Sequence, residues 1–264
     1  MSEAAIKLLR RRWDLPDAAV PVIERFLASW ADGHTSLELT VEEAKLLTPS
    51  AAVSDGRDNA TPAPLVLRDG RLQTWVLAQA ERRVAGKLRE LAAVKTGEMD
   101  TQSDTQSYRN VVAQLFPDPL SEQYQAATLG LTQALTLVTG GPGTGKTTTA
   151  AKLLALLLNR EPSLHFALSA PTGKAANRLG EAMGHAAKTL TGQLAGVRPR
   201  LEEAATHART IHRLLAWNPK INRCRFHAGN LLPYDVVVVD DDGLAETFWK
   251  ILLFFCLFRR FFLL

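Results

Sequence analysis

The sequence predicts an α/β fold in which helices flank a parallel sheet, preceded by a small, mostly helical N-terminal domain. Three observations carry this prediction. An apolar run at 135–138 leads into a glycine-rich turn and a helix-like segment, the order strand, turn and helix recurs from His165, and four valines stand together at 236–239. Apolar runs of this length, bounded by turns, are typical of buried parallel strands. The 264 residues are enough for one large domain or two small ones.

Residues 1–107 are expected to form a separate domain and its linker. Apolar residues at helical spacing predict a helix within 13–30, and Thr40 to Glu43 has the form of a capping box that opens another helix. Residues 65–76 predict a hairpin, because an Asp-Gly turn separates two apolar runs. The polar stretch 92–107 has the composition of a linker. The expected domains are therefore residues 1–107, 108–240 and 241–264.

The second domain is expected to alternate helices and strands. Its predicted helices cover 108–116, 121–134, 146–159 and 173–183, and its predicted strands cover 135–138, 165–170 and 234–239. Residues 184–208 show neither period and are expected to be loop-like. Thr210 is expected to cap a short apolar helix.

The charge and cysteine content restrict the function only broadly. Lys and Arg number 31 against 27 Asp and Glu, which gives a net charge of +4 and a pI near 9.2. This balance permits an anionic partner without requiring one. Cys224 and Cys256 have neither metal-ligand spacing nor a disulfide framework, which favours a reducing, cytoplasmic setting. We expect no secretory signal and no membrane anchor, because the apolar run 251–258 is shorter than the roughly 20 residues that span a bilayer.

The glycine-rich turn has the spacing of a phosphate-binding loop, G-x-x-x-x-G-K-[ST]. Glycines let backbone N–H groups surround a phosphate, and the start of a helix adds the positive end of its dipole. Lys146 is expected to reach the terminal phosphates, and Thr147 to complete a magnesium shell. The predicted nucleotide-binding residues are Gly140, Gly141, Pro142, Gly143, Thr144, Gly145, Lys146, Thr147 and Thr148.

An acidic turn follows the valine run, at the edge of a parallel sheet where ligands gather. Asp240 is expected to hold magnesium together with Thr147, and Asp241 to position or deprotonate the attacking water. Lys146, Asp240 and Asp241 are therefore the predicted catalytic residues. The alternative is a solvated turn, since Asp and Gly favour turns by themselves.

Several segments together resemble one protein family. They are Gln123, GGPGTGKTTTAAKLLALL at 140–157, APTGKAANRL at 170–179, TIHRLLAW at 210–217 and LPYDVVVVD at 232–240. These segments resemble the RecD family of superfamily 1 DNA helicases, the alpha chains of exodeoxyribonuclease V (RecBCD). The match is close over 108–240 and looser at 63–85.

The resemblance implies an incomplete P-loop NTPase domain of the RecA-like kind. It further implies an ATP- and Mg²⁺-dependent motor moving 5′ to 3′ on single-stranded DNA in double-strand break repair and recombination. The implied partners are that DNA and the other two chains of the complex. An alternative is an inactive remnant that only binds nucleotide or docks to a partner chain. A small-molecule kinase is disfavoured, because 170–176 and 210–215 have no role in such an enzyme.

The resemblance also implies roles for single residues. Gln123 would read the adenine edge. Thr172, Lys174, and Thr210 or His212 would contact DNA phosphates without sequence preference. The alternatives are an exposed helix residue for Gln123, a solvated charge for Lys174 and a packed side chain for His212.

The sequence departs from the family pattern after Asp240. The family continues with Asp-Glu-Ala-Ser, whereas this chain has two further aspartates, a glycine and a tail rich in Phe and Leu. The tail has no polar face and matches neither helical nor strand patterning of a soluble core. A shifted reading frame or an insertion that truncates a longer gene product is the simplest hypothesis. We accordingly expect an unpaired sheet edge, poor solubility, weak or no ATP hydrolysis and no unwinding.

Overall fold

The computed structural model describes residues 2–56, 63–95, 105–141, 143–221, 223–227, 229–240 and 260–263. The chain forms two compact units, residues 1–85 and 86–264, and their boundary falls inside helix α4 (Trp75–Ala93). The domain limits expected at 107 and 240 stay predictions. Among the described residues, no helix combines the length and the apolar character needed to cross a bilayer.

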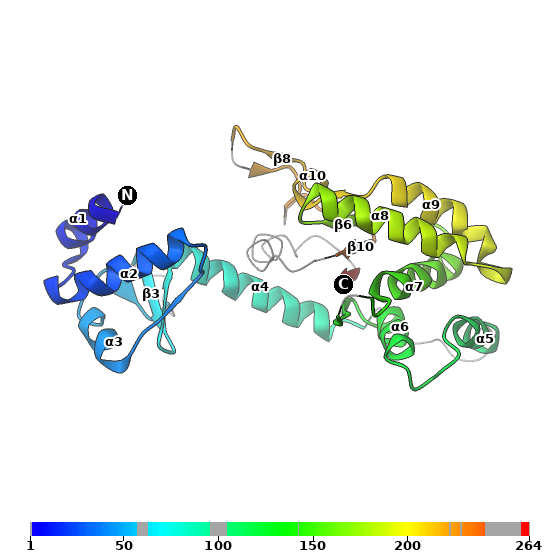
Figure 1. Cartoon of the computed structure of the whole chain (residues 1–264), viewed down its shortest axis with the longest axis horizontal. Helices are drawn as coiled ribbons and strands as arrows, with labels where there is room; N and C mark the ends of the chain where they lie inside the picture. The colour runs from blue at the N-terminus through cyan, green and yellow to red at the C-terminus, as the bar shows by residue number, and fades with distance from the viewer. Residues whose placement is uncertain are drawn as a thin grey trace. The chain divides into compact units, whose positions relative to one another are not determined.

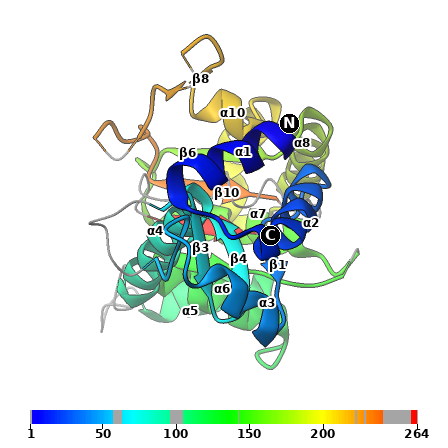
Figure 2. The same cartoon turned by 90° about the vertical axis from the view of Figure 1, so that its left-hand side faces the viewer.

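The first unit packs helices against a small sheet of order β1-β4-β3-β2 (Figures 1 and 2). Its elements are α1 (Ser2–Trp13), the short 3-10 helix η1 (Asp17–Ala19), α2 (Val20–Ala31), β1 (Leu37–Glu38), α3 (Val41–Leu47), β2 (Val53–Ser54), β3 (Leu65–Arg68) and β4 (Arg71–Thr74).

A helix break corrects the prediction of one helix within residues 13–30. Helix α1 ends at Trp13, and α2 begins only at Val20. Asp14 lies between them with φ 50°, and Pro16 follows in an extended conformation. Both residues oppose a continuous right-handed helix, so the predicted helix is present from Val20 onwards and not before it.

The hairpin β3–β4 confirms the prediction for residues 65–76. The strands pair antiparallel around Asp69 and Gly70, whose φ values of 50° and 74° are the positive angles that a two-residue hairpin turn requires. Leu72 of β4 is fully buried in the same core as Ile23 of α2 and Leu47 of α3. This shared core joins the sheet to the helices of the unit.

The capping box at the start of α3 is present. Glu43 accepts from the Thr40 N–H at 2.9 Å, and the Glu43 N–H donates to Thr40 Oγ1 at 3.2 Å. Glu43 also binds Arg25 of α2 through both carboxylate oxygens, at 2.7 and 2.9 Å. The hydrogen bonds from Arg25, followed by that from the Thr40 backbone, lower the pKa of Glu43 to about 2.

This pKa shift makes the stability of the first unit depend on pH. Because the folded-state pKa lies below the ordinary value of about 4.3, the charge of Glu43 stabilises the fold above that value. The contribution is lost as the pH falls towards 2. We expect Glu43→Gln, which can still accept from Thr40, to lower stability at pH 7 and to flatten the decline between pH 4.5 and 2. Urea unfolding across this window, with Glu42→Gln as control, checks the prediction; an unchanged pH slope contradicts it.

The second unit is built on a parallel sheet of order β5-β11-β10-β6-β7. Helix α6 packs on β5 and α7, α7 packs on α8, and α8 packs on β6 and α9 (Figure 1). The elements that follow α4 in the chain are α5 (Thr105–Leu115), α6 (Glu122–Thr132), β5 (Leu135–Leu137), α7 (Lys146–Arg160), β6 (Phe166–Ala170), α8 (Gly173–Lys188), η2 (Gly192–Val197), α9 (Arg198–Thr206), β7 (Arg209–Thr210), α10 (Ile211–Leu214), β8 (Trp217–Asn218), β9 (Arg223–Cys224), β10 (Val236–Val239) and β11 (Arg260–Leu263). The predicted α/β class with a parallel sheet is confirmed.

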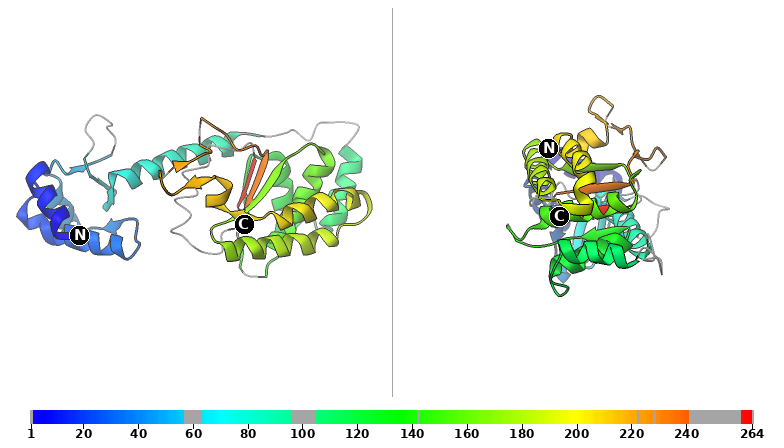
Figure 3. Two further views of the ribbon diagram at one scale, coloured as in Figure 1. Left: turned by 90° about the horizontal axis from the view of Figure 1, so that it is seen from above. Right: turned by 90° about the vertical axis from the view of Figure 1, so that its right-hand side faces the viewer.

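An interior strand of this sheet shows that the expectation for the tail was wrong at its end. Residues Arg260–Leu263 form β11, which pairs in parallel with β10 on one side and with β5 on the other. Figure 3 shows β10 and β11 side by side, in orange and red. The rest of the tail lies outside the described residues. Apolar runs are typical of strands inside a parallel sheet, so the composition of residues 260–263 is compatible with this pairing.

Helical structure in residues 184–208 corrects the prediction of a loop. Helix α8 continues to Lys188, and α9 follows the 3-10 helix η2. Arg200 of α9 donates to the backbone oxygens of Pro162 and Leu164, which fixes α9 against the turn after α7. Tertiary contacts therefore stabilise a segment whose own sequence has little helical pattern.

Candidate functional site: a phosphate loop at one edge of a parallel sheet

The predicted site residues follow strands that end at one edge of the sheet. Register pairs Leu137 of β5 with Leu263 of β11, and Leu263 in turn with Val239 of β10. Val239 pairs with Ser169 of β6. Because all these strands are parallel, the loop after β5, the acid after β10 and the turn after β6 leave from the same edge. The fold thus brings together segments more than 90 residues apart in the sequence.

The loop after β5 has the conformation that its glycines predict. Gly143 and Gly145 have φ values of 78° and 84°, in the left-handed region that favours glycine, and α7 begins directly after Gly145. Thr144 donates through Oγ1 to the Gly141 oxygen at 2.9 Å. A Cβ at Gly140 would lie 2.8 Å from that same hydroxyl, so a side chain there would disturb the turn. Pro142 lies outside the described residues.

Lys146 lies folded back over the loop. Its ammonium donates to the backbone oxygens of Gly140 at 2.9 Å and Gly141 at 3.3 Å. Both acceptors are neutral, and an ionised phosphate oxygen is a stronger one. Lys146 can therefore exchange these bonds for phosphate without leaving the loop, and the 15-residue helix α7 directs its N-terminal dipole end to the same place.

The metal-binding prediction falls on two oxygen-bearing side chains. Thr147 lies in the first turn of α7, and Asp240 follows β10 with only 9% of its surface exposed, its N–H bonded to the Ser169 oxygen at 3.0 Å. The described residues hold no group of three or more His, Cys, Asp or Glu that could bind a metal. Thr147 and Asp240 suit Mg²⁺, which is usually bound by one or two protein oxygens with phosphates and water as its other ligands. Asp241 lies outside the described residues, and Thr148 is exposed on α7.

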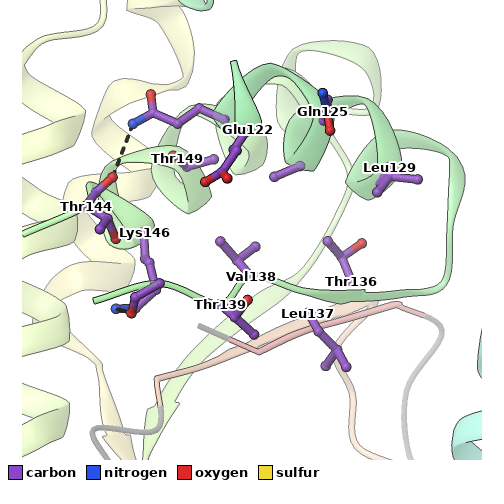
Figure 4. Close-up of a pocket in the computed structure, with 13 residues that line it drawn as sticks. Glu122, Gln125, Leu129, Thr136, Leu137, Val138, Thr139, Thr144, Lys146 and Thr149 are labelled. Atoms are coloured by element: carbon purple, nitrogen blue, oxygen red, sulfur yellow. Dashed lines mark hydrogen bonds between the residues drawn. The ribbon is translucent and has the colours of Figure 1, made fainter. Parts of the chain in front are cut away.

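Gln123 lies against the phosphate loop. Its side-chain Nε2 donates to the Thr144 backbone oxygen at 3.2 Å, as the dashed line in Figure 4 shows. The side-chain amide oxygen of Gln123 can accept a hydrogen bond from a ligand. The side chain is exposed, and this hydrogen bond joins it to a residue 21 positions further along the chain.

A cavity of about 430 Å³ lies between α6 and β5 beside Gln123 (Figure 4). Helix α6 contributes Glu122, Gln125, Ala126 and Leu129, and the strand side contributes Thr136 to Gly140. These α6 residues were not among the predicted site residues. Their spacing of three, four and seven positions was the available signal, since it places them on one helix face.

The predicted DNA-contacting residues lie at the starts of two helices. Thr172 Oγ1 caps α8 by accepting from the Ala175 N–H at 3.2 Å, and Thr210 Oγ1 caps α10 by accepting from the Arg213 N–H at 3.3 Å. Strands β6 and β7 pair Ala170 with Thr210, so both helix starts lie at the edge that carries the phosphate loop.

Lys174 and His212 are exposed at these two helix starts, so neither is a packed core residue. The His212 ring meets Trp217 edge-on, with 6.1 Å between centroids. The structure therefore leaves both side chains accessible to a ligand.

Comparisons with known proteins agree with this geometry. The family model described as AAA domain matches residues 123–254, half of the chain. RecBCD enzyme subunit RecD of Mycolicibacterium smegmatis is 46% identical over 141 residues, which are 51% of this chain and 24% of the relative. The RecD subunit of Buchnera aphidicola subsp. Schizaphis graminum is 31% identical over 191 residues, 72% of this chain and 30% of the relative. The ATP-dependent RecD2 DNA helicase of Deinococcus radiodurans is 31% identical over 205 residues, 74% of this chain and 24% of the relative. The chain spans about a quarter of the length of these relatives.

Proposed function

The chain belongs to the AAA domain family, and we propose that it is the ATP-binding part of a RecD-type DNA helicase subunit. One observation carries the proposal most directly: the phosphate loop and Asp240 leave parallel strands at one edge of a single sheet. The proposed partners are single-stranded DNA and the other two chains of the exodeoxyribonuclease V complex, in double-strand break repair.

The site residues would divide the binding of ATP among them. Lys146 would exchange its bonds to Gly140 and Gly141 for bonds to the terminal phosphates. Gln123 would offer its free amide oxygen to the adenine edge, while its nitrogen holds the loop at Thr144. Thr147 and Asp240 would hold Mg²⁺, which neutralises charge on the transferring phosphoryl group when bound.

A polynucleotide would lie along the helix starts at the same edge. Thr172 and Lys174 begin α8, and Thr210 and His212 begin α10. Contacts of backbone N–H groups, hydroxyls and a lysine with phosphates give binding without sequence preference. An exposed imidazole beside Trp217 adds an aromatic surface on which a base could stack.

Lys146→Ala tests the nucleotide site. We expect ATP to bind at least tenfold more weakly, because the ammonium is the loop's cationic phosphate ligand. The fold should survive, since Lys146 bonds only to carbonyls of its own loop. Titration with a fluorescent ATP analogue measures the affinity, and circular dichroism checks the fold. The control Lys188→Ala removes an exposed lysine at the C-terminal end of α8 and should leave the ATP affinity unchanged.

Nucleotide binding alone does not separate the two function classes, so ATP hydrolysis is measured with and without single-stranded DNA. An active motor should hydrolyse ATP faster when single-stranded DNA is added. Nucleotide binding without DNA-stimulated hydrolysis would favour a remnant that binds nucleotide or docks to a partner. Equal ATP affinity of Lys146→Ala and the unaltered chain would refute the proposed site itself.

A further inference from the structure

Thr136 is a buried polar residue without a hydrogen bond. Only 4% of its surface is exposed, and its Oγ1 has no partner among the described residues. Buried hydroxyls are nearly always bonded, because leaving one unpaired costs its full desolvation penalty. Thr136 lies in the middle of β5, where the core would accept a valine of the same shape. An unpaired hydroxyl at this position is therefore a feature that needs an explanation.

The side chain of Thr136 faces the cavity beside the phosphate loop. Figure 4 shows it directed from β5 towards α6, in the direction of Gln125 and Leu129, whereas the neighbouring Leu137 points away. The cavity of about 430 Å³ falls within the range of small-molecule sites. Its lining combines apolar side chains such as Ala126, Leu129 and Val138 with many polar ones, so it offers a heterocycle both apolar contact and hydrogen-bonding groups.

The cavity reaches from the middle of β5 to the phosphate loop. Thr136 lines it together with Thr144 and Lys146 of that loop. With the phosphates on the loop and Lys146, the base can thus lie between β5 and α6.

We propose that Thr136 is a specificity-determining residue, whose hydroxyl hydrogen-bonds the base of a purine nucleotide in this cavity. The proposal rests on the proposed function, because it needs the phosphates on the loop. A hydroxyl can both donate and accept, so it can meet a ring nitrogen or an exocyclic group. The unpaired hydroxyl of the free protein then gains its partner only when the nucleotide binds.

Thr136→Val in the full chain tests the proposal, because it removes the hydroxyl and keeps the shape. We expect the variant to unfold at a higher temperature than the unaltered chain, since an unpaired buried group is removed. We expect ATP to bind at least fivefold more weakly, and inorganic tripolyphosphate, which has no base, to bind unchanged. The control Thr128→Val removes a hydroxyl that bonds to the Tyr124 oxygen within α6, at 3.0 Å. That control should not raise the unfolding temperature and should not alter the preference for ATP over tripolyphosphate.

The outcomes separate this inference from the proposed function. If the unaltered chain binds neither ATP nor tripolyphosphate, the nucleotide site itself is refuted, and this inference with it. If both ligands bind and Thr136→Val leaves the ATP affinity unchanged, only the role of Thr136 is overturned. An equal loss of ATP and tripolyphosphate, or a lower unfolding temperature, also overturns it, because the hydroxyl then supports the fold and not the base.

Discussion

Phe262→Pro is expected to destabilise the second unit by on the order of 3 kcal/mol, the largest effect that we predict for a single substitution, because it removes a ladder hydrogen bond and leaves the acceptor buried and unpaired. Phe262 pairs with Val238 on one side and with Thr136 on the other, in the middle of the sheet. Proline has no N–H, so a ladder hydrogen bond is lost whichever neighbour that N–H faces. A proline inside a central strand has no compensating solvent contact.

The substitution should also act on the nucleotide site. In the described part of the chain, β5 pairs only with β11, so β11 connects the phosphate-loop strand to the strand that ends at Asp240. Neighbouring strands lie about 4.8 Å apart, and β11 therefore sets a spacing of about 10 Å between β5 and β10. Without it, Thr147 and Asp240 have no fixed distance across which to share a magnesium ion.

Urea unfolding of the full chain, followed by amide hydrogen exchange in β5 and β10, measures this effect. Phe262→Val is the matched control, since it keeps the N–H and a side chain suited to strands. We expect it to retain most of the stability. If the proline and valine variants unfold at the same urea concentration, residues 260–263 are not a required strand of the sheet.

Local chemistry explains which parts of the fold the sequence could predict. Three local patterns determine backbone structure with the help of few neighbouring residues. They are glycine at left-handed positions, a Thr and a Glu three residues apart, and an Asp-Gly turn. The loop at Gly140–Thr147, the capping box at Thr40 and the hairpin at Asp69 were therefore predictable. So was the position of Asp240 at the same edge of the sheet as the loop, because the carboxyl ends of parallel strands share one edge.

The missed features depend on residues far away in the sequence. Strand β11 has a suitable partner only once β5 and β10 lie on either side, so its composition alone indicated an aberrant tail. Helix α9 depends on α8 and on the carbonyls that Arg200 contacts. The unpaired state of the Thr136 hydroxyl is visible only after α6 and β5 have enclosed it. Patterns of period 2 or 3.6 carry none of this information.

Close packing of α8 against α9 gives the second large effect, at Gly180. A Cβ built on Gly180 would lie 2.4 Å from the backbone oxygen of Ala205, a distance that real side chains do not reach. The obstacle is main chain in a helix, and Arg200 ties that helix to the turn after α7, so α9 cannot move away cheaply. Overpacking of a core costs about 1–3 kcal/mol, and displacing a helix adds to this cost.

Gly180→Ala is therefore expected to lower the free energy of unfolding by about 2 kcal/mol, even though alanine is the better helix former by about 1 kcal/mol. Gly184→Ala is the matched control one turn along α8, because its Cβ would meet only the Ala205 side chain, at an ordinary 3.6 Å. There the helix preference should prevail, and the variant should be as stable as the unaltered chain or more so. Urea unfolding of both variants decides the matter: effects of opposite sign show that α9 is packed backbone to backbone on α8, whereas two stabilising substitutions would show that it is not.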